Sequence, residues 1–102
     1  TWRLATYNND LEGIVNATCG VFLYDMDNID DGSAFEIGFI RALHKPVVLV
    51  PFTTDPNKDK VMNLMLAQGV TTIIDGNTEL EQLARYDFNA VPAKPVTGYK
   101  II

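Results

Sequence analysis

Acidic side chains gather in one short stretch of the sequence. Five carboxylates and no lysine or arginine occur between residues 25 and 36: Asp25, Asp27, Asp30, Asp31 and Glu36. Clustered carboxylates suit Mg²⁺ or Ca²⁺, but the spacing is not that of an EF-hand loop. We therefore predict no metal site and no cofactor, and treat the carboxylates themselves as the candidate reactive groups.

Glu36 has two interpretations that the residues alone leave open. Ser33 and Glu36 have the spacing of a capping box, in which the glutamate side chain bonds back to the amide of Ser33. Glu36 also shares a helical face with Ile40 and Leu43, so an acid interrupts an apolar stripe close to a helix N-terminus. An ionised, poorly solvated carboxylate at such a place is what covalent catalysis by a carboxylate requires.

Two other polar residues occupy helical segments. Asp10 follows Tyr7 by three residues and lies on the same helical face, where a solvated surface acid is the ordinary role. Asn63 interrupts an apolar segment that includes Met65, and is either a satisfied interior amide or a ligand contact. Gly32, within the acidic stretch, is small enough to let a ligand approach the backbone.

Apolar periodicity alternates along the chain between helical and strand-like segments. Helices are expected over 2–16, 33–43, 56–68 and 78–85, and buried strands over 19–24, 47–52 and 70–74. A proline-rich stretch follows. Buried strands separated by helices imply a parallel sheet with right-handed crossovers. We predict a three-layer, flavodoxin-like α/β fold with a doubly wound parallel sheet, which lacks its first strand or strands or is completed by a partner subunit.

Length and composition limit the class of protein. The 102 residues, 47% hydrophobic and 21% charged, make one ordinary globular domain. A net charge of −5 argues against a nucleic-acid partner. No apolar run reaches the roughly 18–20 residues that a membrane span requires. The single cysteine, Cys19, excludes an internal disulfide, and we predict a cytoplasmic location.

One combination of segments is distinctive. It comprises residues 6–11 (Thr-Tyr-Asn-Asn-Asp-Leu), 30–38 (Asp-Asp-Gly-Ser-Ala-Phe-Glu-Ile-Gly), 45–46 (Lys-Pro) and 62–65 (Met-Asn-Leu-Met). Together these segments resemble the nucleoside 2-deoxyribosyltransferase family. Residues 19–38 and 68–76 look most like the purine deoxyribosyltransferases of lactobacilli.

The resemblance implies transfer of a 2-deoxyribosyl group between purine bases through a covalent glycosyl-enzyme, with retention. Glu36 matches the family's nucleophile, and Asp10 matches the acid that protonates the leaving base. Asp30 matches an aspartate close to sugar and base, and Asn63 an amide given to a neighbouring subunit's sugar site. The implied partners are purine 2′-deoxynucleosides, free purine bases and further copies of the chain, a hexamer by resemblance. The remaining expected substrate contacts are Tyr7, Gly32 and Met65.

The chain departs from the family pattern at both ends, and two other functions stay open. The family's first strand and its base-holding loop match nothing here, so residues 1–102 are expected to be one domain that is incomplete at its N-terminus. The family ends in tyrosine, whereas this sequence ends in Ile102, and whether the Ile102 carboxylate takes that role is open. The nearest alternative is an N-glycoside hydrolase of deoxynucleoside 5′-monophosphates. A non-catalytic module, such as a receiver domain using Asp25, is the alternative of another class.

Overall fold

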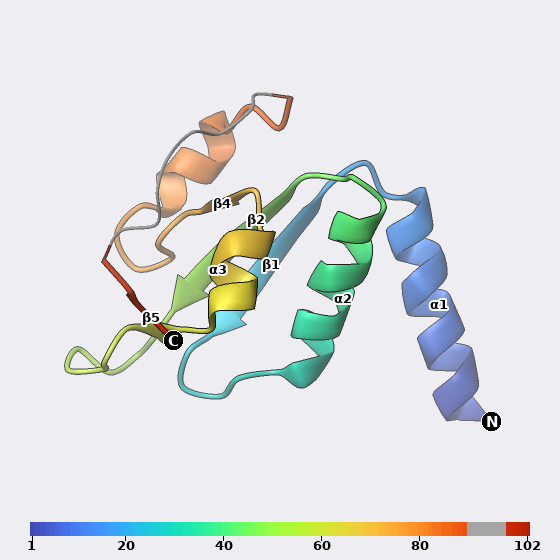
Figure 1. Cartoon of the computed structure of the whole chain (residues 1–102), viewed down its shortest axis with the longest axis horizontal. Helices are drawn as coiled ribbons and strands as arrows, with labels where there is room; N and C mark the ends of the chain where they lie inside the picture. Colours follow the sequence, from blue (N-terminus) through green and yellow to red (C-terminus); the bar gives the residue numbers. More distant parts are fainter. Residues whose placement is uncertain (90–97) are drawn as a thin grey trace.

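A three-stranded parallel sheet forms the centre of the computed structural model, which describes residues 1–89 and 98–102 (Figure 1). The strands are β1 (Gly20–Asp25), β2 (Val47–Phe52) and β4 (Thr72–Ile73), and they lie side by side in chain order. β1 and β2 pair along their whole length, whereas β4 contributes two residues to the pairing with β2. The expected parallel α/β sheet of the flavodoxin-like type is confirmed, with few strands.

Helices cover the sheet on both faces. They are α1 (Trp2–Asn16), α2 (Asp31–Ala42), α3 (Leu64–Gly69) and the 3₁₀ helix η1 (Leu80–Arg85). Val47 and Leu49 of β2 pack in the core cluster that includes residues of α2 and α3, whereas Val48 and Val50 pack in a second cluster that Leu83 of η1 covers. The architecture therefore has three layers. In the part of the chain that the structure describes, no helix is long and apolar enough to cross a lipid bilayer.

The segment before α3 differs from its prediction. The expected helix over 56–68 is wrong, because α3 begins only at Leu64 and the strand β3 (Val61–Met62) precedes it. The Asp55 carboxylate accepts the amide of Asn57 at 2.9 Å, which turns the chain there. β3 pairs in parallel with β5 (Lys100–Ile101), a strand almost forty residues away that the sequence did not predict. Local periodicity cannot report such a partner.

The other elements follow their predictions with shifts at the ends. α1 has the expected bounds, α2 begins two residues early, and β1 is displaced by one residue. The expected strand over 70–74 is present as the shorter β4, and the helix over 78–85 is a 3₁₀ helix over Leu80–Arg85. Within the proline-rich stretch, residues 90–97 lie outside the described residues.

β1 has one unpaired edge within the described residues. The amides of Gly20 and Met26 donate to carbonyls on the β2 side at 2.9 and 3.0 Å. Since amides alternate along a strand, those of Val21 and Leu23 point away from β2. The side chains of Val21 and Leu23 are also exposed, at 43% and 66%. This edge can accept a further strand.

α1 is attached mainly through its C-terminal end. Ile14 is the buried residue of this helix. The Lys45 ammonium, just before β2, donates to the carbonyls of Ile14 and Val15 at 2.8 and 2.6 Å. A positive charge there also complements the helix dipole. Nearer the N-terminus, the ring of Tyr7 lies 6.3 Å from that of Phe35 on α2.

We expect Lys45→Met to loosen α1 and to lower the free energy of unfolding by about 1–3 kcal/mol, since two charge-assisted hydrogen bonds are lost. Urea denaturation measures the change. Lys100→Met is the control, because the Lys100 ammonium makes no hydrogen bond among the described side chains. Equal losses in the two variants would show that the lysine does not hold α1.

Candidate active site

Asp30 begins the helix that carries Glu36. Its Oδ1 accepts the amide of Gly32 at 2.9 Å and its Oδ2 accepts the hydroxyl of Ser33 at 3.2 Å, so Asp30 is the N-cap of α2. Ser33 therefore lies inside the helix, and the capping-box interpretation of Glu36 is wrong. Both Ser33 and Asp30 are good caps by residue type, and the structure uses Asp30. Glu36 is left without a capping role.

Glu36 faces a groove between α1, α2 and β1. The groove has a volume of about 320 Å³, and its walls include Asn9 and Asp10 of α1, Ile40 of α2, and Phe22 of β1. Glu36 is half-buried, whereas Asp10 is exposed. The structure therefore brings the two expected catalytic residues into one groove, although they lie 26 positions apart in the sequence.

The environment of Glu36 disfavours its charged form. Burial raises the pKa of Glu36, and the negative charges of Asp10 and Asp30 raise this pKa further. One of these charges lies on α1, in the same groove, and the other at the N-cap of α2. The free energy of a carboxylate in such surroundings falls when it loses its charge. It can do so by taking up a proton or by forming a bond to an electrophilic carbon.

Asp27, in the same acidic stretch, has a structural role. Its carboxylate accepts the hydroxyl of Thr53 at 2.7 Å and the amide of Thr54 at 2.9 Å, and Lys58 lies 4.0 Å away. These bonds lower the pKa of Asp27 and tie the loop after β1 to the loop after β2. The sequence shows Asp27 only as one of the clustered acids, because its partners Thr53 and Thr54 lie 26 and 27 residues further along the chain. Among the residues described here, no group of three or more acidic, histidine or cysteine side chains could hold a metal ion.

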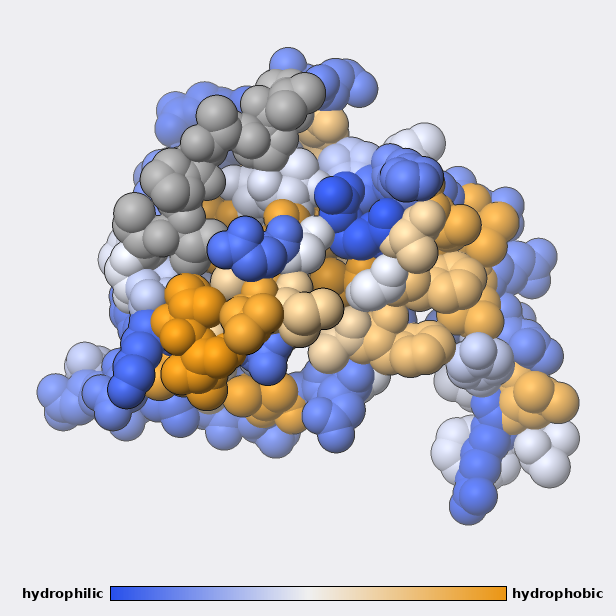
Figure 2. Space-filling view, in the orientation of Figure 1, coloured by the Kyte–Doolittle hydropathy of each residue, from blue (hydrophilic) through white to orange (hydrophobic). Residues whose placement is uncertain are grey.

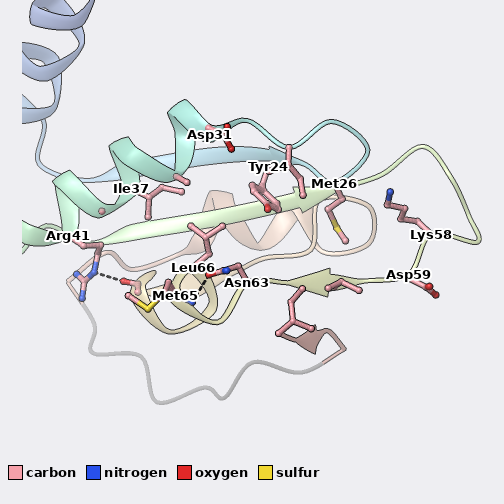
Figure 3. Close-up of a pocket in the computed structure, with 16 residues that line it drawn as sticks. Tyr24, Met26, Asp31, Ile37, Arg41, Lys58, Asp59, Asn63, Met65 and Leu66 are labelled. Atoms are coloured by element: carbon pink, nitrogen blue, oxygen red, sulfur yellow. Dashed lines mark hydrogen bonds between the residues drawn. The ribbon is translucent and has the colours of Figure 1, made fainter.

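Asn63 and Met65 lie on the other flank of α2. They line a cavity of about 840 Å³ between α2 and α3, with Arg41 near one end and Lys58 at the other (Figure 3). The lining residues of α2 are Asp31, Ala34, Ile37, Gly38 and Arg41. Glu36 faces the opposite groove. The structure therefore does not bring Asn63 to Glu36 within one chain.

Asn63 is the N-cap of α3. Its Oδ1 accepts the amide of Met65 at 2.8 Å, which leaves the NH₂ group of the same side chain for other contacts. Asn63 is exposed, so the interior-amide interpretation is wrong. Met65 is 73% exposed, and Figure 2 shows hydrophobic residues gathered on the face that carries α3 and β5.

The remaining expected contacts are spread around the start of α2. Gly32 donates its amide to Asp30, which lines a smaller cavity of about 390 Å³ with Tyr24 and Asp25 at the carboxyl end of β1. Tyr7 is half-exposed, on the side of α1 that meets α2. Ligands of open parallel sheets bind at this edge.

The described fold is thus a parallel α/β sheet in which a half-buried glutamate and a neighbouring aspartate line one groove beside the edge strand β1. A family model described as nucleoside 2-deoxyribosyltransferase matches residues 1–65, which include every expected site residue. The chain belongs to the nucleoside 2-deoxyribosyltransferase family, and the resemblance seen in the sequence is confirmed.

Proteins named nucleoside deoxyribosyltransferase are similar to most of the chain. The one from Limosilactobacillus fermentum is 46% identical over 100 residues, which are 98% of this chain and 59% of the relative. Those from Lactobacillus leichmannii and Lactobacillus johnsonii are 36% and 34% identical, each over 86% of this chain and 52% and 55% of the relative. The chain thus spans little more than half the length of these relatives.

The raised pKa of Glu36 predicts how stability depends on pH. The folded protein holds this proton more tightly than the unfolded chain does, so the stability gained by protonation is complete below the ordinary pKa of 4.5 and is lost as pH rises through the folded value. The glutamine of Glu36→Gln cannot ionise, so this variant does not lose that stability as pH rises. We expect the variant to become more stable than the wild type as the pH of a thermal-unfolding series is raised from acid to neutral.

Asp27→Asn is the control, because the pKa of Asp27 is shifted in the opposite direction and its effect on stability has the opposite pH dependence. Because the pKa of Asp27 is lowered, its contribution to stability is present above the ordinary value of 3.8 and is lost as pH falls through the folded value. This variant should be less stable than the wild type at neutral pH and should approach it in acid. Parallel pH curves for wild type and Glu36→Gln would contradict the raised pKa.

Proposed function

We propose that the protein transfers a 2-deoxyribosyl group from one purine base to another through a covalent glycosyl-enzyme on Glu36. The observation that supports this most directly is the groove that holds Glu36 and Asp10 together, with Glu36 half-buried and free of a capping role. Membership of the deoxyribosyltransferase family supports the same chemistry. The reaction needs one carboxylate to attack the sugar and a second carboxyl group to manage a proton.

In the first step, a carboxylate oxygen of Glu36 attacks C1′ of the donor nucleoside while the bond from C1′ to the base nitrogen breaks. The departing base takes the bonding electrons together with a proton from Asp10. Positive charge develops on the sugar as the base departs, and the negative Glu36 stabilises that charge before it bonds. The absence of a 2′-hydroxyl favours this step, because no electron-withdrawing group opposes the charge.

In the second step, a nitrogen of the acceptor purine attacks C1′ and the ester bond to Glu36 breaks. The acceptor loses its proton to Asp10, which restores both carboxyl groups to their starting states. Two displacements at one carbon give net retention of the β configuration.

The proposed substrates are free purine 2′-deoxynucleosides and purine bases, used in the cytoplasm, with no nucleic acid or membrane partner. Asp30, beside the cavity at the end of β1, would accept a hydrogen bond from a 5′-hydroxyl. A 5′-phosphate there would cost about 4 kcal/mol for each pair of unit charges 4 Å apart at an effective dielectric of 20. This repulsion favours nucleosides over 5′-monophosphates.

We also propose a homo-oligomer, a hexamer by likeness to the family, in which the NH₂ group of Asn63 binds the sugar in a neighbouring copy. Three observations support this assembly: Asn63 lies across α2 from Glu36, Met65 beside it is largely exposed, and the sheet has few strands. Tyr7, Gly32 and Met65 are proposed as further substrate contacts.

Replacement of the nucleophile tests the first step. We expect Glu36→Gln, in the intact protein, to lower the rate of transfer by several orders of magnitude, because an amide cannot form the glycosyl ester. Its melting temperature at neutral pH should not fall, since repulsion from Asp10 is removed. Glu12→Gln, an exposed glutamate of α1, is the matched control and should keep full activity. Transfer by Glu36→Gln at more than a few per cent of wild type would exclude the covalent role.

A donor with and without an acceptor tests the second step. Deoxyinosine and adenine should give deoxyadenosine and hypoxanthine in equal amounts with little free deoxyribose, because a bound base excludes water and is held near C1′ at high effective concentration. Chromatography of the products measures both reactions.

Three other results of that experiment would contradict transfer. Free deoxyribose that forms as fast with adenine as without it would make the protein a hydrolase. Faster cleavage of deoxyinosine 5′-monophosphate than of deoxyinosine would identify the hydrolase of monophosphates. Binding without turnover would favour the non-catalytic module.

A further inference from the structure

The backbone on both sides of Asn63 is bonded to a single residue, Ile102, which directly follows β5. The amide of Ile102 donates to the carbonyl of Met62 at 3.0 Å, and the carbonyl of Ile102 accepts the amide of Leu64 at 2.7 Å. Met62 and Leu64 are the two neighbours of Asn63 in the chain. The peptide units that set the direction of the Asn63 side chain are therefore held by Ile102.

β5 is in turn anchored to the rest of the fold. The Lys100 amide donates to the carbonyl of Lys60 at 2.7 Å. The Tyr99 hydroxyl donates to Oδ2 of Asp75 at 3.3 Å, and the Lys60 ammonium lies 3.1 Å from the same oxygen. Tyr99 packs against the main core cluster. These contacts fix β5 relative to the end of β4.

α3 is too short to orient Asn63 by itself. The helix has six residues, Leu64–Gly69, and an isolated helix of this length is not stable in water. The Asn63 Oδ1 accepts a hydrogen bond from the Met65 amide, which fixes the side chain relative to the backbone. The direction of the NH₂ group of Asn63 therefore depends on the backbone at this place. Ile102 holds this backbone through its hydrogen bonds to Met62 and Leu64.

We propose that β5, through the two backbone hydrogen bonds of Ile102, positions Asn63 for its contact with the sugar. Ile102 is then a positioning residue that touches no substrate and acts through Asn63. The inference rests on the proposed function, in which Asn63 binds the sugar of the nucleoside. It assigns the β3–β5 pair a role in substrate affinity and none in the chemical step at Glu36.

Proline substitution at two adjacent positions tests the proposal. Ile102→Pro removes the amide that bonds to Met62. Ile101→Pro removes an amide that alternation directs away from β3, because the amides of Lys100 and Ile102 are the ones that bond there. Both variants change an isoleucine to proline at adjacent positions, at the end of β5 and directly after it. Because, of these two amides, only that of Ile102 bonds to the β3 segment, only the Ile102 variant should disturb Asn63.

We expect Ile102→Pro to raise the KM for deoxyinosine about tenfold, the effect of losing one hydrogen bond to the ligand, with kcat within a factor of two. Ile101→Pro should change neither value. Added to Asn63→Ala, Ile102→Pro should raise KM no further, because the contact is already lost. Amide exchange of Leu64 and Met65, measured without substrate, should be faster in Ile102→Pro and unchanged in Ile101→Pro, while exchange in β1 and β2 stays as in the wild type.

Equal KM values in the two proline variants, additive effects in the double variant, or unchanged exchange at Leu64 and Met65 would each overturn the proposal. A fall in kcat with unchanged KM would overturn it too, because the segment would then act on the chemical step. An intact wild-type protein without transferase activity would refute the proposed function, and the exchange comparison would still decide whether β5 holds Asn63.

Discussion

Burial of β2 on both faces is the constraint from which the rest of the architecture follows. Residues 47–50 of this strand are 0–1% exposed, so helices must cover each face of the sheet. A helix that connects β1 to a parallel neighbour has to start at the carboxyl end of β1 and run back across the sheet. α2 does this, and its first turns therefore lie where open sheets bind ligands. The position of Glu36 is a consequence of how β2 is buried.

Opposing electrostatic effects meet on α2. The dipole of the helix favours a negative charge near its N-terminus, whereas partial burial and the carboxylates of Asp10 and Asp30 disfavour one at Glu36. Burial, as the largest cause, and these two neighbouring charges raise the pKa of Glu36. In the proposed reaction Asp10 carries its proton when Glu36 attacks, so the repulsion that remains comes from Asp30. The glycosyl ester is neutral, and its formation relieves both this repulsion and the cost of burying a charge.

The parts of the fold that local patterns specify could be predicted, and those that depend on distant partners could not. Apolar periodicity predicted α1, α2, β1 and β2 to within a few residues. β3 was mistaken for helix, because only its pairing with β5 makes it a strand. At the site, family resemblance implied the roles of Glu36 and Asp10, and the structure places both residues in one groove. Two acceptable caps, Asp30 and Ser33, stand three residues apart, and residue type alone does not decide between them.

The separation of Glu36 from Asn63 bears on how the site is assembled. They face opposite flanks of α2, and a helix with its side chains is about 10 Å across, more than a deoxyribose can bridge. If both residues touch one sugar, as proposed, they must belong to different copies. In a two-fold symmetric interface each copy gives its Asn63 to the other and receives one in return, so two sites form together. β5, which holds Asn63, would then set the substrate affinity of a neighbouring subunit, while α1 and α2 set the chemistry of their own.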